Sequence, residues 1–378
     1  MRIALYRPAE SDGDPYPFGD SRVGELMAGA LRFAGHEVEP KELTCGSSDI
    51  EISQAVADLT SSGRPAPDVW ISSQVDGRSG DRIGPAVSVA LAIPYILLQP
   101  RLDRSAHAAG SDAAFPFHAI AAANATFVLS AAYAAKLAEH LPGHADRLVV
   151  LPPFIDLDAV QPVIGNRQNN RTLLAHKHQL PTDVPWLIVA GPMATDGDLD
   201  AFRLLIQAMT PLTTLKWCLI IVASGRRDSD VGSLLGRMPV RQHRLLTVDS
   251  QGDLLALLAC GDLLIWPSTD EGLALPAIEA QALGLPVVAG RTAAMQEVVA
   301  DGRTGMLIKP GNAASLGNAI GFLLRHPEFL RSHAEQGPKW VARHFDVRAV
   351  VAQLDATLHR VVRCAGPGDP PPPVRAVD

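Results

Sequence analysis

The chain has 378 residues, of which 47% are hydrophobic and 19% are charged, and its formal net charge is −7. This length favours two domains over a single core, and the apolar content is high enough for large cores. The acidic balance, with no basic run longer than Arg226-Arg227, argues against a nucleic-acid-binding surface.

The four cysteines are scattered along the chain and form no C-x-x-C pair, so neither a zinc site nor a disulfide framework is indicated. Cys218 and Cys260 lie in apolar segments and are expected to be small buried residues. We expect no secretory leader, because the first residues enter a strand-like run at once, and no apolar run approaches the length of a membrane span. These features predict a soluble, cytoplasmic protein and leave peripheral membrane contact open.

Short apolar runs alternate with helix-like stretches in the first part of the chain, which is the pattern of a parallel α/β sheet. The expected strands lie at 2–6, 69–72, 95–98, 126–129 and 148–151, and the expected helices at 23–34, 85–92 and 131–141. The polar loop 7–20, between the first strand and the first helix, is long enough to be functional.

A second series of apolar runs predicts a second α/β domain. Its expected strands lie at 186–190, 217–223, 244–248, 262–266, 286–289 and 306–308. We therefore place one domain at 1–160, a polar hinge near 160–171, a second domain at 172–345 and a last helix within 346–363. The proline-rich tail 364–378 has too little apolar content to order itself.

The second domain contains a strand, a loop and a helix in direct succession. The strand ends at Pro267, and Pro276 is suited to the first helical position because its φ is already helical. The helix is expected to end at Gly284. The free N–H groups of its first turn point toward the carboxyl end of the strand, where they suit a phosphate. Glu271 in the loop and Glu279 in the helix, eight residues apart, can border the same small space.

The flanks of these glutamates carry a family resemblance. Glu271-Gly272, Leu275-Pro276, Glu279-Ala280 and the run GLPVV at 284–288 resemble the donor-site signature of the family-4 (group 1) retaining glycosyltransferases. Downstream, the run QEVVADGRTGMLI at 296–308 resembles the PEVV-DG-TG-L segment of the same family.

The resemblance implies the GT-B fold, with two Rossmann-like domains facing across a cleft and a last helix that crosses back to the first domain. It implies transfer of a sugar, with retention, from a nucleotide sugar bound by the second domain to an acceptor on the first. No metal or other cofactor is required on this scheme. Donor sugar, nucleotide base and acceptor are not indicated.

The resemblance also assigns roles to particular residues. Glu271 would be catalytic, holding donor-sugar hydroxyls near the reacting carbon, and Glu279 would accept hydrogen bonds from the ribose hydroxyls. The remaining expected donor-binding residues are Gly272, Leu273, Ala274 and Leu275 at the helix start, Gly19 in the first loop, and Arg226 with Arg227.

Two positions depart from the family pattern. The segment GPMATDG at 191–197 lacks the Arg and Lys that stabilise the departing phosphate, and Gln99-Pro100 stands where the family has a histidine. Arg226 and Arg227 are the preferred replacement cations, because they follow an expected strand directly and should emerge at its carboxyl edge. Other candidates are Arg291, His107 and His118.

Two alternative functions stay open. The missing cations would permit a non-catalytic GT-B relative that binds a sugar nucleotide or a partner protein, and the same architecture serves sugar-nucleotide epimerases. Asp228-Ser229-Asp230 has the spacing of a metal-binding D-x-D motif, but it is expected in a polar loop of a Rossmann-like domain, so we assign it no metal.

Overall fold

A computed structural model of the protein describes residues 1–9, 20–44, 49–60, 65–73, 81, 83–100, 115–192, 196–224, 228–236, 243–248, 250–268 and 275–364. These residues form two compact units. The first unit contains the described residues up to Pro152 and those from Val347 onward, and the second contains the described residues from Pro153 to Asp346. Within the described residues, no helix combines the length and apolarity that a membrane crossing needs.

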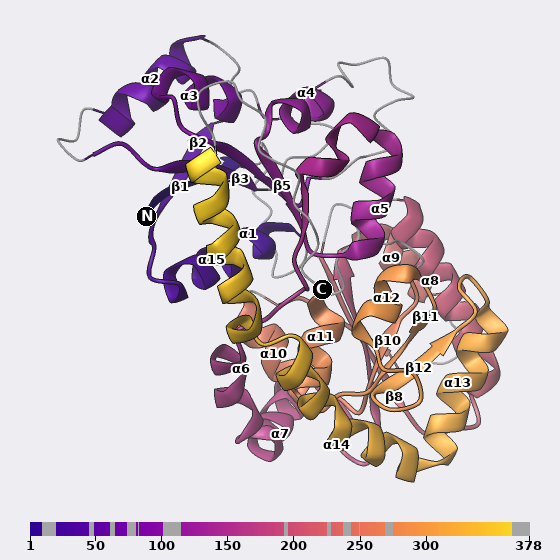
Figure 1. Ribbon diagram of the computed structural model, residues 1–378. Coiled ribbons are helices and arrows are strands. Elements are labelled where there is room, and N and C mark those ends of the chain that lie inside the picture. The colour runs from indigo at the N-terminus through magenta and orange to yellow at the C-terminus, as the bar shows by residue number, and fades with distance from the viewer. Residues whose placement is uncertain are drawn as a thin grey trace. The chain divides into compact units, whose positions relative to one another are not determined.

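The first unit is built on a parallel sheet with the strand order β2-β1-β3-β4-β5-β6 (Figure 1). Its strands are β1 Arg2–Ala9, β2 Glu37–Thr44, β3 Val69–Ser73, β4 Tyr95–Leu98, β5 Ala125–Val128 and β6 Leu148–Val150. Its helices are α1 Asp20–Phe33, α2 Asp49–Thr60, α3 Ile83–Leu91, α4 Phe115–Ala122, α5 Ala131–His140, the 3-10 helix Pro142–Arg147, and α15 Val347–Cys364. All the strands predicted in this half are present.

Both faces of the first sheet are covered. Tyr6, Trp70 and Tyr95, from neighbouring strands, are almost fully buried in a core with residues of α2, α3 and α4. Helix α15, the last described element, packs against α1. Because alternate side chains of each strand point to opposite faces, burial on both faces makes the inner strands read as continuous apolar runs.

Strand β2 is the one strand of this sheet that the sequence did not predict. Its segment, EVEPKELT, is charged and contains Pro40. Among the described strands it lies at the edge of the sheet and pairs with β1, and an edge tolerates both proline and charge. Glu39 accepts hydrogen bonds from Arg2 at 3.0 Å and from Lys41 at 2.7 Å, so charged side chains pair along the edge.

The second unit has a parallel sheet with the order β12-β11-β10-β7-β8-β9. Its strands are β7 Trp186–Pro192, β8 Cys218–Ser224, β9 His243–Leu246, β10 Leu263–Trp266, β11 Val287–Gly290 and β12 Gly305–Ile308. Its helices are α6 Leu157–Ile164, α7 Arg167–His178, α8 Asp196–Met209, the 3-10 helix Thr210–Leu212, α9 Asp228–Leu235, α10 Gln251–Cys260, α11 Leu275–Ala282, α12 Ala293–Val298, α13 Ala313–Arg325 and α14 Pro327–His344. This is the strand order of dinucleotide-binding Rossmann sheets. Strands β8 and β9 are added on one side of β7, and strands β10 to β12 are added on its other side, so the strand order reverses between β7 and β10.

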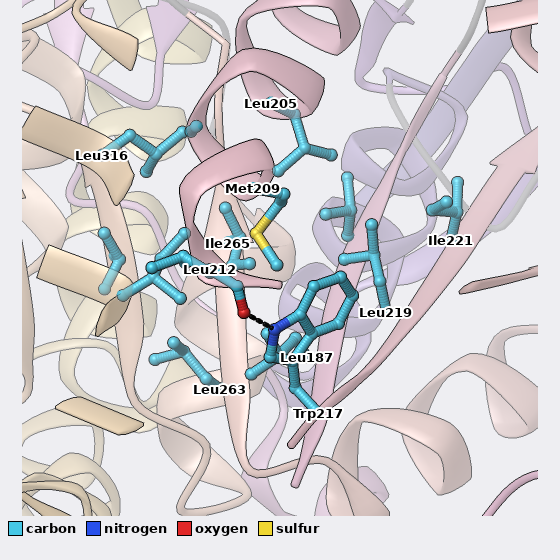
Figure 2. Close-up of a cluster of buried hydrophobic side chains, with 14 of the residues drawn as sticks. Leu187, Leu205, Met209, Leu212, Trp217, Leu219, Ile221, Leu263, Ile265 and Leu316 are labelled. Atoms are coloured by element: carbon cyan, nitrogen blue, oxygen red, sulfur yellow. Dashed lines mark hydrogen bonds between the residues drawn. The ribbon is translucent and has the colours of Figure 1, made fainter. Parts of the chain in front are cut away.

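The main core of the second unit lies between its sheet and helices α8 and α13 (Figure 2). Trp217 is 1% exposed, and its indole N–H donates to the carbonyl oxygen of Leu212 at 2.9 Å, so its polar atom is satisfied inside the core. Cys218 and Cys260 are buried, as predicted. Burial raises the pKa of both thiols, that of Cys260 to about 11, so neither is a reactive thiolate at neutral pH.

Part of the expected polar hinge is helical. Helices α6 and α7 occupy it, and both contact elements of the second unit. Arg171 of α7 donates to the carbonyl of Cys260 at 2.6 Å and to the carboxylate of Asp262 at 3.0 Å. Its guanidinium carbon also lies 4.2 Å from the centre of the Trp186 ring. The polar sequence therefore belongs in part to helices that arginine contacts hold against the second unit.

Candidate functional site

The carboxyl edge of the second sheet brings β10, β7 and the start of α11 into one neighbourhood. Strand β10 ends at Trp266 beside β7, where the strand order reverses. Ligands of open α/β sheets bind at such a reversal, beyond the carboxyl ends of the strands. Helix α11 begins at Leu275, and all eight of its residues are buried. Gly284, at φ +73°, follows the helix as predicted, because this left-handed conformation favours glycine.

Glu279 lies one turn into α11, as predicted, and its side chain is buried at 1% exposure. Its Oε1 accepts a hydrogen bond from Nε2 of Gln251 at 3.0 Å. Gln251 is the first residue of α10, and the preceding Ser250 caps that helix by accepting from the backbone N–H of Asp253 at 3.2 Å. The starts of two helices that follow strands of this sheet are therefore joined by one side-chain contact.

Gln251 is a site residue that sequence reasoning missed. A signal was available, because it follows a helix-capping serine just after the expected strand at 244–248. A helix that follows a parallel strand begins at the carboxyl edge of the sheet, where Glu279 was already expected.

Several predicted site residues lie outside the described residues: Glu271, Gly272, Leu273, Ala274, Arg226, Arg227, Gly19 and His107. The described neighbours of the two arginines are Ser224, which ends β8, and Asp228, which begins α9. Asp228, Ser229 and Asp230, expected in a loop, open that helix instead. The pairing of Glu271 with Glu279 stays a prediction.

Two of the other candidate cations are described. Arg291, just after β11, forms an ion pair with Asp301 and donates to the carbonyl of Leu307 at 3.0 Å. A carboxylate and a carbonyl therefore already engage its guanidinium. His118 is an exposed residue of α4 in the first unit.

Gln99, at the position of the family histidine, is fixed in the first unit. It is 7% exposed and has φ +46°, a left-handed conformation that costs free energy in a residue other than glycine. Its backbone N–H donates to the carbonyl of Phe127, and its side-chain oxygen accepts from the backbone N–H of Leu129, both at 2.7 Å. The amide side chain therefore holds the end of β4 against the chain at the end of β5.

A second buried polar cluster surrounds Asp81, just before α3 in the first unit. Its carboxylate accepts from the hydroxyl of Tyr95 at 2.7 Å and from the backbone N–H of Gly84 at 2.8 Å. Burial raises the pKa of Asp81, and the hydrogen bonds oppose that shift. Because both carboxylate oxygens have protein partners, the cluster serves to fix the start of α3.

Comparisons with known proteins find similarity in both sequence and fold. Residues 184–326 match the family model described as "Glycosyl transferases group 1", a stretch that runs from just before β7 to the end of α13 and includes Glu279. The structure of HepE from Anabaena, solved with UDP and glucose, superposes with a TM-score of 0.72 over 94% of this chain and 99% of that one, at 16% identity. That likeness establishes the GT-B fold. The match to the group 1 glycosyl transferase model thus lies within the second unit of a chain that has the GT-B fold.

Two named relatives align with parts of the chain. The D-inositol 3-phosphate glycosyltransferase of Xylanimonas cellulosilytica is 30% identical over 227 residues, covering 58% of this chain and 54% of the relative. The MMP alpha-(1->4)-mannosyltransferase of Mycolicibacterium hassiacum is 37% identical over 114 residues, covering 30% of this chain and 28% of the relative. The alignments thus span about half, or less, of the length of these relatives.

Proposed function

We propose that the protein is a retaining glycosyltransferase that moves a sugar from a nucleotide-sugar donor to an acceptor. The observation that carries the proposal is the buried carboxylate of Glu279, oriented by Gln251 one turn into a helix that starts beside the strand reversal. The two relatives named above are a glycosyltransferase and a mannosyltransferase. The HepE structure was solved with UDP and glucose.

Glu279 would bind the ribose of the donor. An ionised carboxylate accepts hydrogen bonds strongly and can take two from adjacent hydroxyls. The backbone N–H groups at the start of α11 are without helical partners, so they suit the diphosphate. Glu271 would then hold donor-sugar hydroxyls near the anomeric carbon.

Transfer needs no metal on this proposal. The diphosphate charge that develops as the sugar leaves would be met by helix-terminal N–H groups and by Arg226 with Arg227. Turnover is therefore expected to survive excess EDTA. Complete loss of activity with chelator, restored by manganese or magnesium, would contradict metal independence while leaving the transferase assignment intact.

The acceptor would bind to the first unit, and a cytoplasmic location and peripheral membrane contact belong to the same proposal.

A non-catalytic relative is the second candidate, favoured by the absence of Arg and Lys from 191–197. That role would keep nucleotide-sugar binding and lose turnover.

A donor panel tests the proposal. UDP-, GDP- and ADP-sugars are compared for thermal stabilisation, because a ligand that binds the folded state raises its melting temperature. The donor that stabilises is then incubated with the protein, and release of nucleoside diphosphate and any epimerised donor are measured. Transfer or slow hydrolysis supports the transferase. Binding without turnover supports the non-catalytic relative, and conversion to an epimeric sugar nucleotide supports an epimerase.

A further inference from the structure

A basic pocket in the second unit lies away from Glu279, at the end of helix α14. Its volume is about 180 Å³. The residues that line it are Arg303, Gln336, Lys339, Trp340, Arg343 and His344. Arg303 comes from the turn just before β12, and the other five come from α14.

The pocket lies toward the amino edge of the sheet. Arg303 immediately precedes Thr304 and the first residue of β12, and its backbone N–H donates to the carbonyl of Ala300 at 2.9 Å. In a parallel sheet, the turns that precede strands lie at the opposite edge from the starts of the helices that follow strands. The pocket is therefore separate from the edge at which Glu279 and Gln251 meet.

Trp340 forms a fixed aromatic wall. Its indole N–H donates to the carbonyl of Val298, at the end of α12, at 3.1 Å. The ring of His344 lies 4.0 Å from the Trp340 ring between centroids, and the guanidinium carbon of Arg303 lies 5.9 Å from the ring centroid. The hydrogen bond sets the direction of the indole, so the cations gather around a rigid surface.

The three strong cations of the pocket are not neutralised. Within the described part of the chain, none of Arg303, Lys339 and Arg343 forms an ion pair. By contrast, Arg171 pairs with Asp262, and Arg291 pairs with Asp301. All three side chains are exposed, so solvent screens much of their mutual repulsion, and an anion bound in the pocket would interact favourably with all three charges at once.

The dipole of α14 explains only part of this arrangement. Cations near the carboxyl end of a helix are stabilised by its last carbonyls, which accounts for Arg343 and His344. It does not account for Arg303, which reaches the pocket from a different element. Convergence of two arginines from separate elements suits a tetrahedral oxyanion, because each guanidinium can donate two hydrogen bonds.

We propose that this pocket binds a phosphate group, carried either by a small soluble phosphorylated compound or by an anionic lipid headgroup. Pockets for drug-sized ligands measure about 300–1,000 Å³, so a cavity of about 180 Å³ suits a phosphate with a few further atoms and not a whole nucleotide sugar. The inference is independent of the proposed transferase activity, because it concerns the other edge of the sheet.

The test compares the wild-type chain with the double variant Arg303→Gln/Lys339→Gln. A matched control, Lys216→Gln/Arg325→Gln, removes the same charge from exposed positions of the same unit outside the pocket. Binding of inorganic phosphate is measured by calorimetry at low ionic strength. Vesicles of phosphatidylcholine, with and without phosphatidic acid, are used in a sedimentation assay.

We expect the pocket variant to bind phosphate, or vesicles that contain phosphatidic acid, about tenfold or more weakly than wild type, and the control to stay within about twofold. Binding of free phosphate alone identifies a soluble ligand, and selective binding of the anionic vesicles identifies a lipid headgroup. Equal binding by wild type and pocket variant overturns the proposal, as does the failure of wild type to bind either probe. Melting temperatures of all three proteins show that the comparison is made between folded chains.

Discussion

The side-chain amide of Gln251 donates a hydrogen bond to Oε1 of Glu279 at 3.0 Å, joining the start of α10 to the second turn of α11. A neutral amide orients a carboxyl group without forming an ion pair with it. The contact therefore sets the direction of the Glu279 side chain at the start of the two helices.

We expect the two glutamates to act at different stages. Glu279→Ala should weaken binding of the nucleoside diphosphate about tenfold or more, because a ribose contact made in both ground and transition states is lost. Glu271→Ala should chiefly lower kcat. Calorimetry with the nucleotide and steady-state kinetics separate these effects. Equal nucleotide affinity of wild type and Glu279→Ala would refute the ribose assignment.

Gln251→Ala should act in the same direction as Glu279→Ala but more weakly. The variant leaves the carboxylate in place and removes the group that orients it, so KM for the donor should rise several-fold with a smaller change in kcat. Loss of a hydrogen bond to a buried acceptor should also lower the free energy of unfolding by about 1–3 kcal/mol. Gln207→Ala, at an exposed position of α8, is the control and should change neither quantity.

Arg226 and Arg227 are expected to supply the charge that the segment 191–197 lacks. Removing one preorganised donor to developing charge costs about 10² to 10³ in rate, so Arg226→Ala/Arg227→Ala should lower transfer or donor hydrolysis by at least that factor. Turnover is measured with the donor identified in the panel. Wild-type turnover in the double variant would show that these residues are not the phosphate clamp.

His333 makes stability depend on pH. Its Nε2 lies 3.2 Å from the carbonyl oxygen of Gly302, while the buried Nδ1 has no hydrogen-bond partner. Burial lowers the pKa of His333 below its usual value of 6.5, and the contact with the Gly302 carbonyl raises it by a smaller amount. Below about pH 6.5 the unfolded state therefore binds more protons, and the free energy of unfolding should fall as the pH falls.

The variant His333→Gln keeps a side-chain N–H for Gly302 and removes the titration. Its melting temperature should fall less between pH 7.5 and pH 5.5 than that of wild type. Part of the wild-type dependence should remain, because burial also lowers the pKa of His36. The exposed His326→Gln is the control. An unchanged pH dependence in His333→Gln would exclude His333 as the cause.

Gly337 allows α14 to pack closely on the helix that carries Glu279. A Cβ at this position would lie 2.6 Å from the carbonyl oxygen of Gln281 in α11, too close for a normal contact. Gly337→Ala should therefore destabilise the protein by about 1–3 kcal/mol, although alanine is the better helix former. Gly232→Ala in α9, where the added Cβ would meet nothing within 4 Å beyond its chain neighbours and the backbone of its own helix, should be neutral or slightly stabilising. A thermal unfolding series measures both, and equal effects would contradict the packing argument.

The sequence determined the α/β class and the inner strands of both sheets. Strand β4, predicted at 95–98, has those bounds, and its burial on both faces is the reason that it reads as an uninterrupted apolar run. The start and end of α11, and with them the place of Glu279, followed from the local conformational preferences of Pro276 and Gly284.

Only the tertiary structure decided which distant residues meet. The charged edge strand β2 is defined by its pairing with β1, and the contact of Gln251 with Glu279 depends on how α10 packs beside α11. The basic pocket joins Arg303 to Arg343, forty residues further along the chain. Periodicity and capping act over one or two turns of chain, whereas these contacts follow from the packing of whole helices against the sheet, which no local pattern encodes.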